Sequence, residues 1–485
     1  MVVAIRESHF KIFGSDFRFH VFPHVVVSFS SRFGRPRKKL YVIIMYNFYC
    51  MNEFQFRPSF IQLPAYHSFE GSLCLPGSKS ITNRVFLISA LAEGTTHLKN
   101  LLKSDDTRYM GEALQRLGVK IDFTDDFKDA VVVGHGGPFD GPSPSIELFL
   151  GNAGTAMRSL TAALSLGWGK FILRGEERMS ERPIRDLVDA LRTLDADIKY
   201  LESEGYPPVR IKADGLKGGD VSVRGNISSQ YLTALLICAP YCKTPLHIHV
   251  EGKLISAPYI ELTLDVMKRF GVDVRHDGLT DFYVPQGCYK SPGEFFVEGD
   301  ASSASYPLAA AAIAKGKVRV LGVGKESHQG DVGFAKVLEK MGAKIEIGPD
   351  WIECDGRGCE LKGLDMNLND IPDAAMTVSV LALFAKGTTT IRGIGSWRVK
   401  ETDRIAAISA ELQKVGARVI ADMDTITIEP PEQLQPATIE TYNDHRMAMC
   451  FSLVSLGGVP MKILDPACVN KTYPHFFEDF GRLAQ

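Results

Sequence analysis

The sequence predicts an α/β protein of two domains, each built from three similar units with helices inside and sheets outside. Three observations lead to this fold class. The chain has 485 residues, more than a single hydrophobic core usually supports. One pattern of helices and strands recurs six times along it. One helix of each unit is apolar on nearly every face, as a helix at the centre of a domain must be.

Composition indicates an ordinary globular chain. Hydrophobic residues make up 45% of it, charged residues 23%, and the formal net charge is −2. This balance does not predict binding to nucleic acid or to a membrane surface, and no apolar run is as long as the roughly 18–20 residues of a spanning helix. The nine cysteines contain no CxxC pair and no zinc pattern. We expect reduced, structural cysteines and no metal site.

The first fifty residues differ from the rest. They contain eight lysines and arginines against two acids, Glu7 and Asp16, and a basic cluster at 34–39. This composition fits a transit presequence, or an extension upstream of a true start at Met51. We favour the extension, which implies a cytoplasmic protein. A transit peptide would imply a plastid instead.

The end of each helix marks the repeat. Five segments read as the last turns of an amphipathic helix, a tight turn and an alternating strand: 113–123, 190–201, 266–276, 337–347 and 411–421. Four of them place glycine at the turn, at Gly118, Gly271, Gly342 and Gly416, and the fifth places Asp195 there. We expect a left-handed residue at each of these positions.

Six helix openings recur at a similar interval. They are SKSITNR (78–84), GNAGTAMR (151–158), SSQYLTA (228–234), DASSASY (300–306), PDAAMT (372–377) and NDHRMAM (443–449). If the six helices are parallel within each domain, their N-termini gather at one end. Each N-terminus carries free N–H groups and a partial positive charge, so two facing domains would form an anion trap.

The residues at and near these openings strengthen the prediction of an anion site. Cations occur at Lys79, Arg84, Arg158, Arg182, Lys400, Arg404, Arg446 and Lys471. Guanidinium groups suit bidentate contact with phosphate or carboxylate. Ser80, Ser228 and Ser229 are natural N-caps or phosphate ligands, and the glycines of GNAG allow close approach of a ligand. No GxGxxG, GxxxxGK[ST], HExxH or GxSxG motif occurs. These observations alone predict an enzyme or binding protein for a small polyanion.

At these residues the sequence closely resembles the 5-enolpyruvylshikimate-3-phosphate synthase (3-phosphoshikimate 1-carboxyvinyltransferase) family. The motifs LPGSKSITNR, GNAGTAMR, GDASSASY, WRVKETDR and NDHRMAM occur in the family's order, from about Phe56 to the C-terminus. The resemblance implies the inside-out α/β prism fold, without metal or cofactor, and a monomer. It implies domain boundaries at 51–77 with 299–485, and at 78–298, with 1–50 outside.

The resemblance also implies the reaction, in which the enolpyruvyl group of phosphoenolpyruvate passes to the 5-hydroxyl of shikimate 3-phosphate. This is a step of aromatic amino acid biosynthesis. The residues implied at shikimate 3-phosphate are Lys79, Ser80, Arg84, Ser228, Ser229, Gln230, Ser256, Asp373, Ser396 and Lys400. Those implied at phosphoenolpyruvate are Lys79, Asn152, Gly154, Arg182, Gln230, Arg404, Arg446 and Lys471. Asp373 would take the hydroxyl proton and Glu401 would protonate the methylene carbon, with Lys79 and Lys400 beside them.

Two positions depart from the family pattern, and two other functions stay open. Ser159 stands where the family usually has proline, and Ser396 where some members have asparagine. The nearest alternative is the sister transferase that acts on UDP-N-acetylglucosamine, which typically uses a loop cysteine. The loop after GNAGTAMR has none. A non-catalytic anion-binding scaffold is the other alternative.

Overall fold

The computed structural model describes residues 6–12, 15–21, 58–141 and 145–485. The chain divides into two units, Met1–Phe56 and Arg57–Gln485. In the first, strands β1 (Arg6–Ile12) and β2 (Ser15–Val21) pair antiparallel, with Arg6 opposite Val21. The basic cluster at 34–39 and the start at Met51 lie outside the described residues. The two interpretations of the first fifty residues therefore stay predictions.

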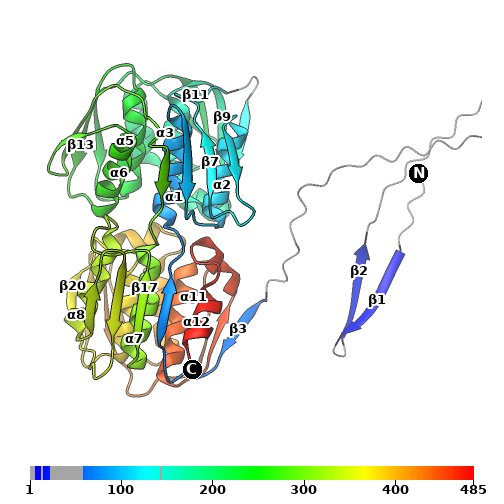
Figure 1. Cartoon of the computed structure of the whole chain (residues 1–485), viewed down its shortest axis with the longest axis vertical. Coiled ribbons are helices and arrows are strands. Elements are labelled where there is room, and N and C mark those ends of the chain that lie inside the picture. Colours follow the sequence, from blue (N-terminus) through cyan, green and yellow to red (C-terminus); the bar gives the residue numbers. More distant parts are fainter. Residues whose placement is uncertain (1–5, 13–14, 22–57, 142–144) are drawn as a thin grey trace, which may run out of the picture. The chain divides into compact units, whose positions relative to one another are not determined.

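The second unit contains two hydrophobic cores. One is formed by residues between Ile81 and Val297, and we call this part the middle lobe. The other joins residues 63–75 to residues 301–484, and we call it the end lobe. Figure 1 shows the two lobes one above the other, with helices enclosed by sheets in each. The domain boundaries given above stay a prediction.

Three helices lie at the centre of each lobe and are buried along almost their whole length. In the middle lobe they are α1 (Lys79–Leu91), α3 (Gly154–Ser165) and α5 (Ser229–Cys238). In the end lobe they are α7 (Ala301–Ala314), α9 (Ala375–Leu381) and α11 (His445–Ser452). The six predicted helix openings are therefore the starts of the six central helices. Amphipathic helices α2 (Asp105–Arg116), α4 (Arg185–Thr193), α6 (Pro258–Arg269), α8 (Phe334–Met341), α10 (Arg404–Lys414) and α12 (Phe476–Leu483) accompany them.

The middle lobe has three four-stranded sheets. Their orders are β16-β5-β7-β6, β10-β11-β9-β8 and β12-β13-β15-β14. The strands are β5 (Thr95–Lys99), β6 (Lys120–Phe123), β7 (Ala130–Val133), β8 (Ile146–Phe149), β9 (Trp168–Arg174), β10 (Asp197–Tyr200), β11 (Val209–Asp214), β12 (Gly219–Arg224), β13 (Leu246–Glu251), β14 (Arg275–Asp277), β15 (Asp281–Val284) and β16 (Glu294–Phe296). Each sheet combines one parallel pair with two antiparallel pairs, so the repeat extends to strand pairing.

The end lobe repeats this pattern. Its sheets have the orders β18-β19-β17-β4, β20-β21-β23-β22 and β24-β25-β3. The strands are β3 (Phe60–Leu63), β4 (Gly71–Cys74), β17 (Lys317–Leu321), β18 (Lys344–Ile347), β19 (Trp351–Asp355), β20 (Asp365–Asn367), β21 (Thr389–Arg392), β22 (Arg418–Ala421), β23 (Thr425–Glu429), β24 (Ala437–Ile439) and β25 (Met461–Leu464). Among the described residues the third sheet has three strands, and its strand β3 comes from before the first crossing between the lobes.

The chain crosses between the lobes twice, and the two crossings lie side by side. Gly77 and Gly299 form an antiparallel bridge, and the Asp300 N–H donates to the Pro76 carbonyl at 2.8 Å. Strand β4 precedes α1 in the chain but pairs with β17, and β16 precedes α7 but pairs with β5. The end lobe therefore takes two strands, β3 and β4, from before the first crossing, whereas every described strand of the middle lobe lies between the two crossings.

The predicted turns are confirmed. Gly118, Gly271, Gly342 and Gly416 have φ between 86° and 112°, and Asp195 has a φ of 70°. Some predicted caps are wrong. Ser78 caps α1 and Ser228 caps α5, whereas Ser80 and Ser229 lie inside the first turns of these helices. Within the described residues, no helix is both long and apolar enough to cross a bilayer.

Candidate active site

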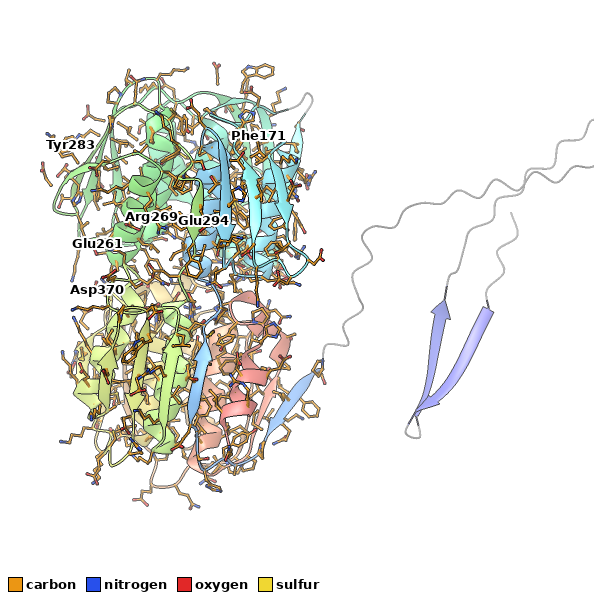
Figure 2. The ribbon with its side chains drawn as sticks, viewed as in Figure 1. Phe171, Glu261, Arg269, Tyr283, Glu294 and Asp370 are labelled. Carbon is orange, nitrogen blue, oxygen red and sulfur yellow. The ribbon has the colours of Figure 1, made fainter. Side chains whose placement is uncertain are left out.

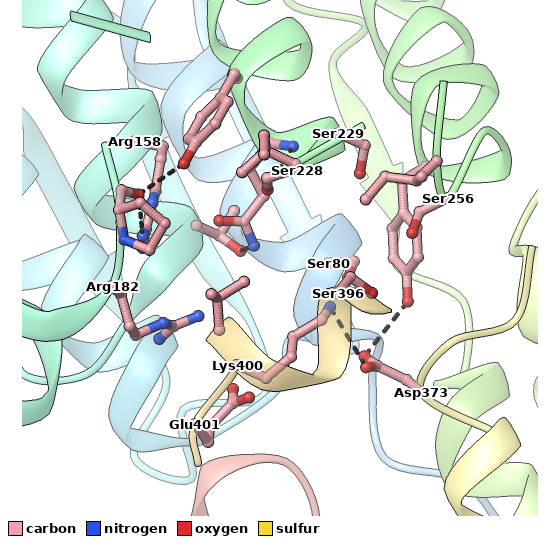
Figure 3. Close-up of a pocket in the computed structure, with 18 of the residues that line it drawn as sticks. Ser80, Arg158, Arg182, Ser228, Ser229, Ser256, Asp373, Ser396, Lys400 and Glu401 are labelled. Carbon is pink, nitrogen blue, oxygen red and sulfur yellow. Dashed lines mark hydrogen bonds and ion pairs between the residues drawn. The ribbon is translucent and has the colours of Figure 1, made fainter. Parts of the chain in front are cut away.

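A cavity lined by residues of both lobes lies between them, at the starts of the central helices. Twelve of the seventeen predicted site residues line it (Figure 3). They are Lys79, Ser80, Arg84, Arg182, Ser228, Ser229, Gln230, Ser256, Asp373, Ser396, Lys400 and Glu401. The other five are Asn152, Gly154, Arg404, Arg446 and Lys471. The first four each contact a lining residue, and Lys471 contacts Asn152. The polar clustering predicted from the helix openings is therefore present in three dimensions.

The middle lobe contributes a wall of hydroxyl and amide groups. Ser228 and Ser229 stand at the start of α5, and the Gln230 amide donates to Thr155 Oγ1 at 3.5 Å. Ser256 is buried and holds a left-handed conformation, with a φ of 53°. A strained residue of this kind at a pocket is a common feature of ligand sites. This wall offers hydrogen bonds without negative charge, which suits a phosphorylated, hydroxylated ligand.

Arg84 adds a positive charge next to these hydroxyl and amide groups. Its guanidinium donates to Thr263 Oγ1 at 2.9 Å, to Thr233 Oγ1 at 3.2 Å and to the Ser80 carbonyl at 2.9 Å. All these acceptors are neutral. Burial lowers the pKa of Arg84 to about 10, so the group is still protonated at neutral pH. A buried cation with only neutral partners favours the binding of an anion nearby.

The end lobe contributes an ion-pair network centred on Arg404. This guanidinium is 1% exposed and donates to three carboxylates. The distances are 2.7 Å to Asp444, 2.9 Å to Asp373 and 2.9 Å to Glu401. Arg404 lies on the first turn of α10, and the fork of its guanidinium can bridge acceptors from separate segments. It therefore fixes both predicted catalytic carboxylates at once.

Asp373 is held on both sides. Its Oδ1 accepts from Arg404 and lies 3.7 Å from the Lys400 ammonium, while its Oδ2 accepts from Arg446 at 2.8 Å. Figure 3 shows the Lys400 contact across the cavity floor. Burial alone would raise the pKa of Asp373, but Arg446, Lys400 and Arg404 hold it well below its ordinary value. This carboxylate is therefore ionised, and it accepts hydrogen bonds from two arginines.

Glu401 lines the cavity and is the second predicted catalytic carboxylate that pairs with Arg404. Burial would raise the pKa of Glu401, but Arg404 and Arg182 outweigh burial and hold it well below its ordinary value. Burial lowers the pKa of the adjacent Lys400 ammonium, and Asp373 only partly offsets this. Both carboxylates are therefore charged until a ligand alters the balance of cations around them.

The remaining predicted residues form a basic corner. Lys471 donates to Asp106 at 2.8 Å and to the Asn152 carbonyl at 3.0 Å, and Arg182 donates to Asn152 Oδ1 at 2.8 Å. Lys79 lies 3.8 Å from the same Asp106. Two lysines thus share one carboxylate, and each lysine retains capacity for a further anion.

Gly154 leaves room for two guanidinium groups in this corner. A Cβ at position 154 would lie 2.6 Å from Arg182 Nη2 and 2.9 Å from Arg158 Nη1. The glycine lets two guanidinium groups approach the start of α3, where the free N–H groups already favour an anion.

Several site residues were not predicted from the sequence. Tyr259 donates from its hydroxyl to Asp373 at 3.4 Å, and Asp106 links Lys79 to Lys471. His445 is fully buried, and burial together with Arg446 holds its pKa well below its usual value, so the imidazole is neutral. Arg158, one of the predicted cations, lines the cavity, and so does Thr155 of the same GNAGTAMR opening. Tyr259 and Asp106 lie in outer helices, outside the repeated openings.

Comparisons with known proteins show the family of this chain. Residues 65–480 match the family described as EPSP synthase (3-phosphoshikimate 1-carboxyvinyltransferase). The 3-phosphoshikimate 1-carboxyvinyltransferase of Sulfurovum sp. (strain NBC37-1) is 57% identical over 419 residues, which cover 86% of this chain and 97% of that protein. The protein of the same name from Serratia proteamaculans (strain 568) is 58% identical over 416 residues, covering 86% of this chain and 96% of that protein.

Solved structures agree as well. EPSP synthase from Acinetobacter baumannii superimposes with a TM-score of 0.73 at 27% identity, covering 88% of this chain and 98% of that one. The enolpyruvyl transferase NikO from Streptomyces tendae gives a TM-score of 0.71 at 16% identity, with the same coverage, and shows the fold alone. The predicted inside-out α/β fold is confirmed. The chain belongs to the EPSP synthase (3-phosphoshikimate 1-carboxyvinyltransferase) family.

Proposed function

We propose that this chain is an enzyme that transfers the enolpyruvyl group of phosphoenolpyruvate to the 5-hydroxyl of shikimate 3-phosphate and releases phosphate. The observation that carries the proposal is the convergence of cations from both lobes on one cavity that also holds two carboxylates. Lys79, Arg84 and Arg182 come from the middle lobe, and Lys400 comes from the end lobe. Two substrates that carry several negative charges need this excess of cations to lie side by side.

The hydroxyl-rich wall of the middle lobe is the proposed site of shikimate 3-phosphate. Ser228, Ser229, Gln230 and Ser256 would bind its phosphate, because serine hydroxyls and the N-terminus of α5 are good phosphate ligands. Arg84 supplies the countercharge. Ser80, Ser396 and Lys400 would hold the ring hydroxyls and carboxylate from the other sides.

The basic corner is the proposed site of phosphoenolpyruvate. Arg182, Lys471 and Lys79 surround the start of α3, where Asn152 and Gly154 shape the pocket. Arg404 and Arg446 would hold the remaining charge. Both guanidinium groups pair with carboxylates in this structure. Ligand binding would replace these carboxylate partners by ligand oxygens.

This exchange of partners gives a mechanism. When ligand anions take up Arg404, Arg446 and Lys400, Asp373 and Glu401 lose the cations that depress their pKa values. Asp373 can then accept the proton of the 5-hydroxyl. Glu401 can take up a proton and deliver it to the methylene carbon of phosphoenolpyruvate as the oxygen adds to the neighbouring carbon.

The resulting intermediate has a methyl group and a tetrahedral carbon. Glu401, which is a carboxylate after this step, can take back a proton from that methyl group as phosphate departs, and the enolpyruvyl ether results. The cations of the cleft stabilise the charge that develops on the departing phosphate. Approach of the lobes would exclude water, which competes as a nucleophile.

The test is phosphate release when the purified protein is mixed with both substrates. We expect release only when shikimate 3-phosphate and phosphoenolpyruvate are present together, and none when UDP-N-acetylglucosamine replaces the first. Release with the nucleotide sugar instead would assign the chain to the sister reaction. No release with either acceptor would favour a binding scaffold. A monomeric state and a cytoplasmic location stay predictions and are checked separately by light scattering and fractionation.

A further inference from the structure

The two lobes touch at a point where no side chain fits. Gly330 begins the 3-10 turn Gly330–Gly333 of the end lobe, and Pro258 begins α6 of the middle lobe. A Cβ at position 330 would lie 2.5 Å from the Pro258 Cβ and 2.8 Å from the Asp370 carbonyl oxygen. Gly330 does not have a positive φ, so space rather than backbone conformation requires the glycine. Three segments therefore meet there in direct contact.

Two of these segments, those of Pro258 and Asp370, lead directly to a side chain of the candidate active site. Pro258 precedes Tyr259, whose hydroxyl donates to Asp373 at 3.4 Å across the lobe boundary. Asp370 lies three residues before Asp373 on the same short connection. Figure 2 labels Asp370 in the end lobe and Glu261 of α6 in the middle lobe, on the two sides of the boundary between the lobes.

The hydrogen bond between Tyr259 and Asp373 is sensitive to this spacing. At 3.4 Å it is near the limit for an O–H donor, so a further separation of about 1 Å would break it. Ser256, two residues before Pro258, lines the cavity and would move with the same segment. The contact at Gly330 thus controls groups on the proposed acceptor side of the cleft. The proposed phosphoenolpyruvate corner is formed by other segments.

We propose that Gly330 is a positioning residue for the transfer reaction. By admitting the Pro258 ring against the Asp370 carbonyl, it sets how closely the lobes approach on the acceptor side and so places Tyr259 against Asp373. This role rests on the proposed function. It predicts that enlarging residue 330 affects shikimate 3-phosphate more than phosphoenolpyruvate.

The test compares Gly330→Ala with Gly333→Ala. Gly333 belongs to the same turn and also lacks a positive φ, but a Cβ there would lie 3.3 Å from Ile371 Cγ2, a side-chain atom of the same lobe. For Gly330→Ala we expect the KM for shikimate 3-phosphate to rise at least tenfold and kcat to fall, because a misplacement of about 1 Å can cost about 100-fold in rate. The KM for phosphoenolpyruvate should change less than threefold. Gly333→Ala should stay within threefold of wild type in every constant.

A second substitution separates the contact between lobes from damage inside the end lobe. Pro258→Gly removes the ring that an alanine at position 330 would meet, but leaves the Asp370 carbonyl in place. Alone it should raise the KM for shikimate 3-phosphate a few-fold, because the contact becomes loose. Combined with Gly330→Ala it should bring the KM for shikimate 3-phosphate most of the way back to that of Pro258→Gly alone, and the remaining loss reports the Asp370 carbonyl, 2.8 Å from the new Cβ.

The outcomes are distinct. Equal kinetics for Gly330→Ala and Gly333→Ala would overturn the positioning role, and so would additive losses in the double variant. If Gly330→Ala does not fold, Pro258→Gly alone decides, and an unchanged KM for shikimate 3-phosphate would overturn the role. A wild-type protein that releases no phosphate would reject the proposed function, and the positioning role with it.

Discussion

Replacing Glu401 by glutamine tests the proposed proton donor to carbon. Glu401 is 8% exposed and accepts from Arg404 at 2.9 Å. Glutamine has nearly the same volume and still offers an oxygen to that guanidinium, so the shape of the cavity is kept. What is lost is the ionisable proton and one negative charge in a group of cations.

The expected size of the effect follows from these two losses. A positioned general acid contributes roughly 10²–10⁴-fold to rate, which corresponds to about 3–5 kcal/mol of barrier. The lost negative charge leaves Arg404 and Arg182 less compensated, so phosphoenolpyruvate should bind as well as before or more tightly. We therefore expect kcat to fall 10²–10⁴-fold, with an unchanged or lower KM for phosphoenolpyruvate.

The assay is steady-state phosphate release, with Glu411→Gln as the matched control. Glu411 is also buried, lies in α10 of the same lobe and pairs with Lys414 at 2.8 Å, but it is outside the cavity. The control should lose thermal stability and keep its kcat within about twofold. A Glu401→Gln enzyme whose kcat stays within threefold of wild type would refute the assignment.

Three further predictions concern the pocket and its surroundings. Gly154→Ala should raise the KM for phosphoenolpyruvate about tenfold or more and leave that for shikimate 3-phosphate nearly unchanged, because its Cβ would meet Arg182 at 2.6 Å; equal effects on both constants would contradict this. Burial and the charge of Asp373 raise the pKa of Asp331 to about 7, so the stability contributed by this protonated carboxyl should be lost as pH rises from about 4 to 7. Asp331→Asn should remove that loss, giving about 1–3 kcal/mol more stability relative to wild type at pH 8 than at pH 4 in urea unfolding; a parallel pH dependence would exclude it. Ser159 lies in the second turn of α3, and Ser159→Pro should strengthen inhibition by mimics of phosphoenolpyruvate such as glyphosate, whereas unchanged inhibition would count against a role for this position.

The parts of the fold that could be predicted are those governed by local chemistry. A left-handed turn needs glycine or a tolerant residue, so the turns at Gly118, Gly342 and Asp195 were visible in the sequence. The apolar central helices were visible because burial on all sides leaves no polar face. Caps were less certain, since Ser78 and Ser80 both stand at one opening and only tertiary packing decides that Ser78 accepts the N–H group.

The residues of the candidate site also fall into those that the sequence could predict and those that it could not. Residues at the repeated openings could be predicted because the repeat places them at six equivalent helix starts. Tyr259 could not, because its partner Asp373 lies 114 residues away and no periodicity connects α6 to that segment. The pairing of Arg404 with three carboxylates also depends on how segments meet in space. The sequence shows which side chains are charged, but not which of them form ion pairs with one another.

The most direct measurement follows the reaction with ¹³C-labelled phosphoenolpyruvate and shikimate 3-phosphate in D₂O by NMR. If the cleft transfers the enolpyruvyl group through protonation of the methylene carbon, each phosphate released should be matched by one enolpyruvyl ether. Deuterium should also appear in the methylene group of that ether, because the intermediate methyl group carries one solvent-derived hydrogen. Phosphate released with pyruvate instead of the ether, or an ether free of deuterium, would contradict the proposed function and the role given to Glu401.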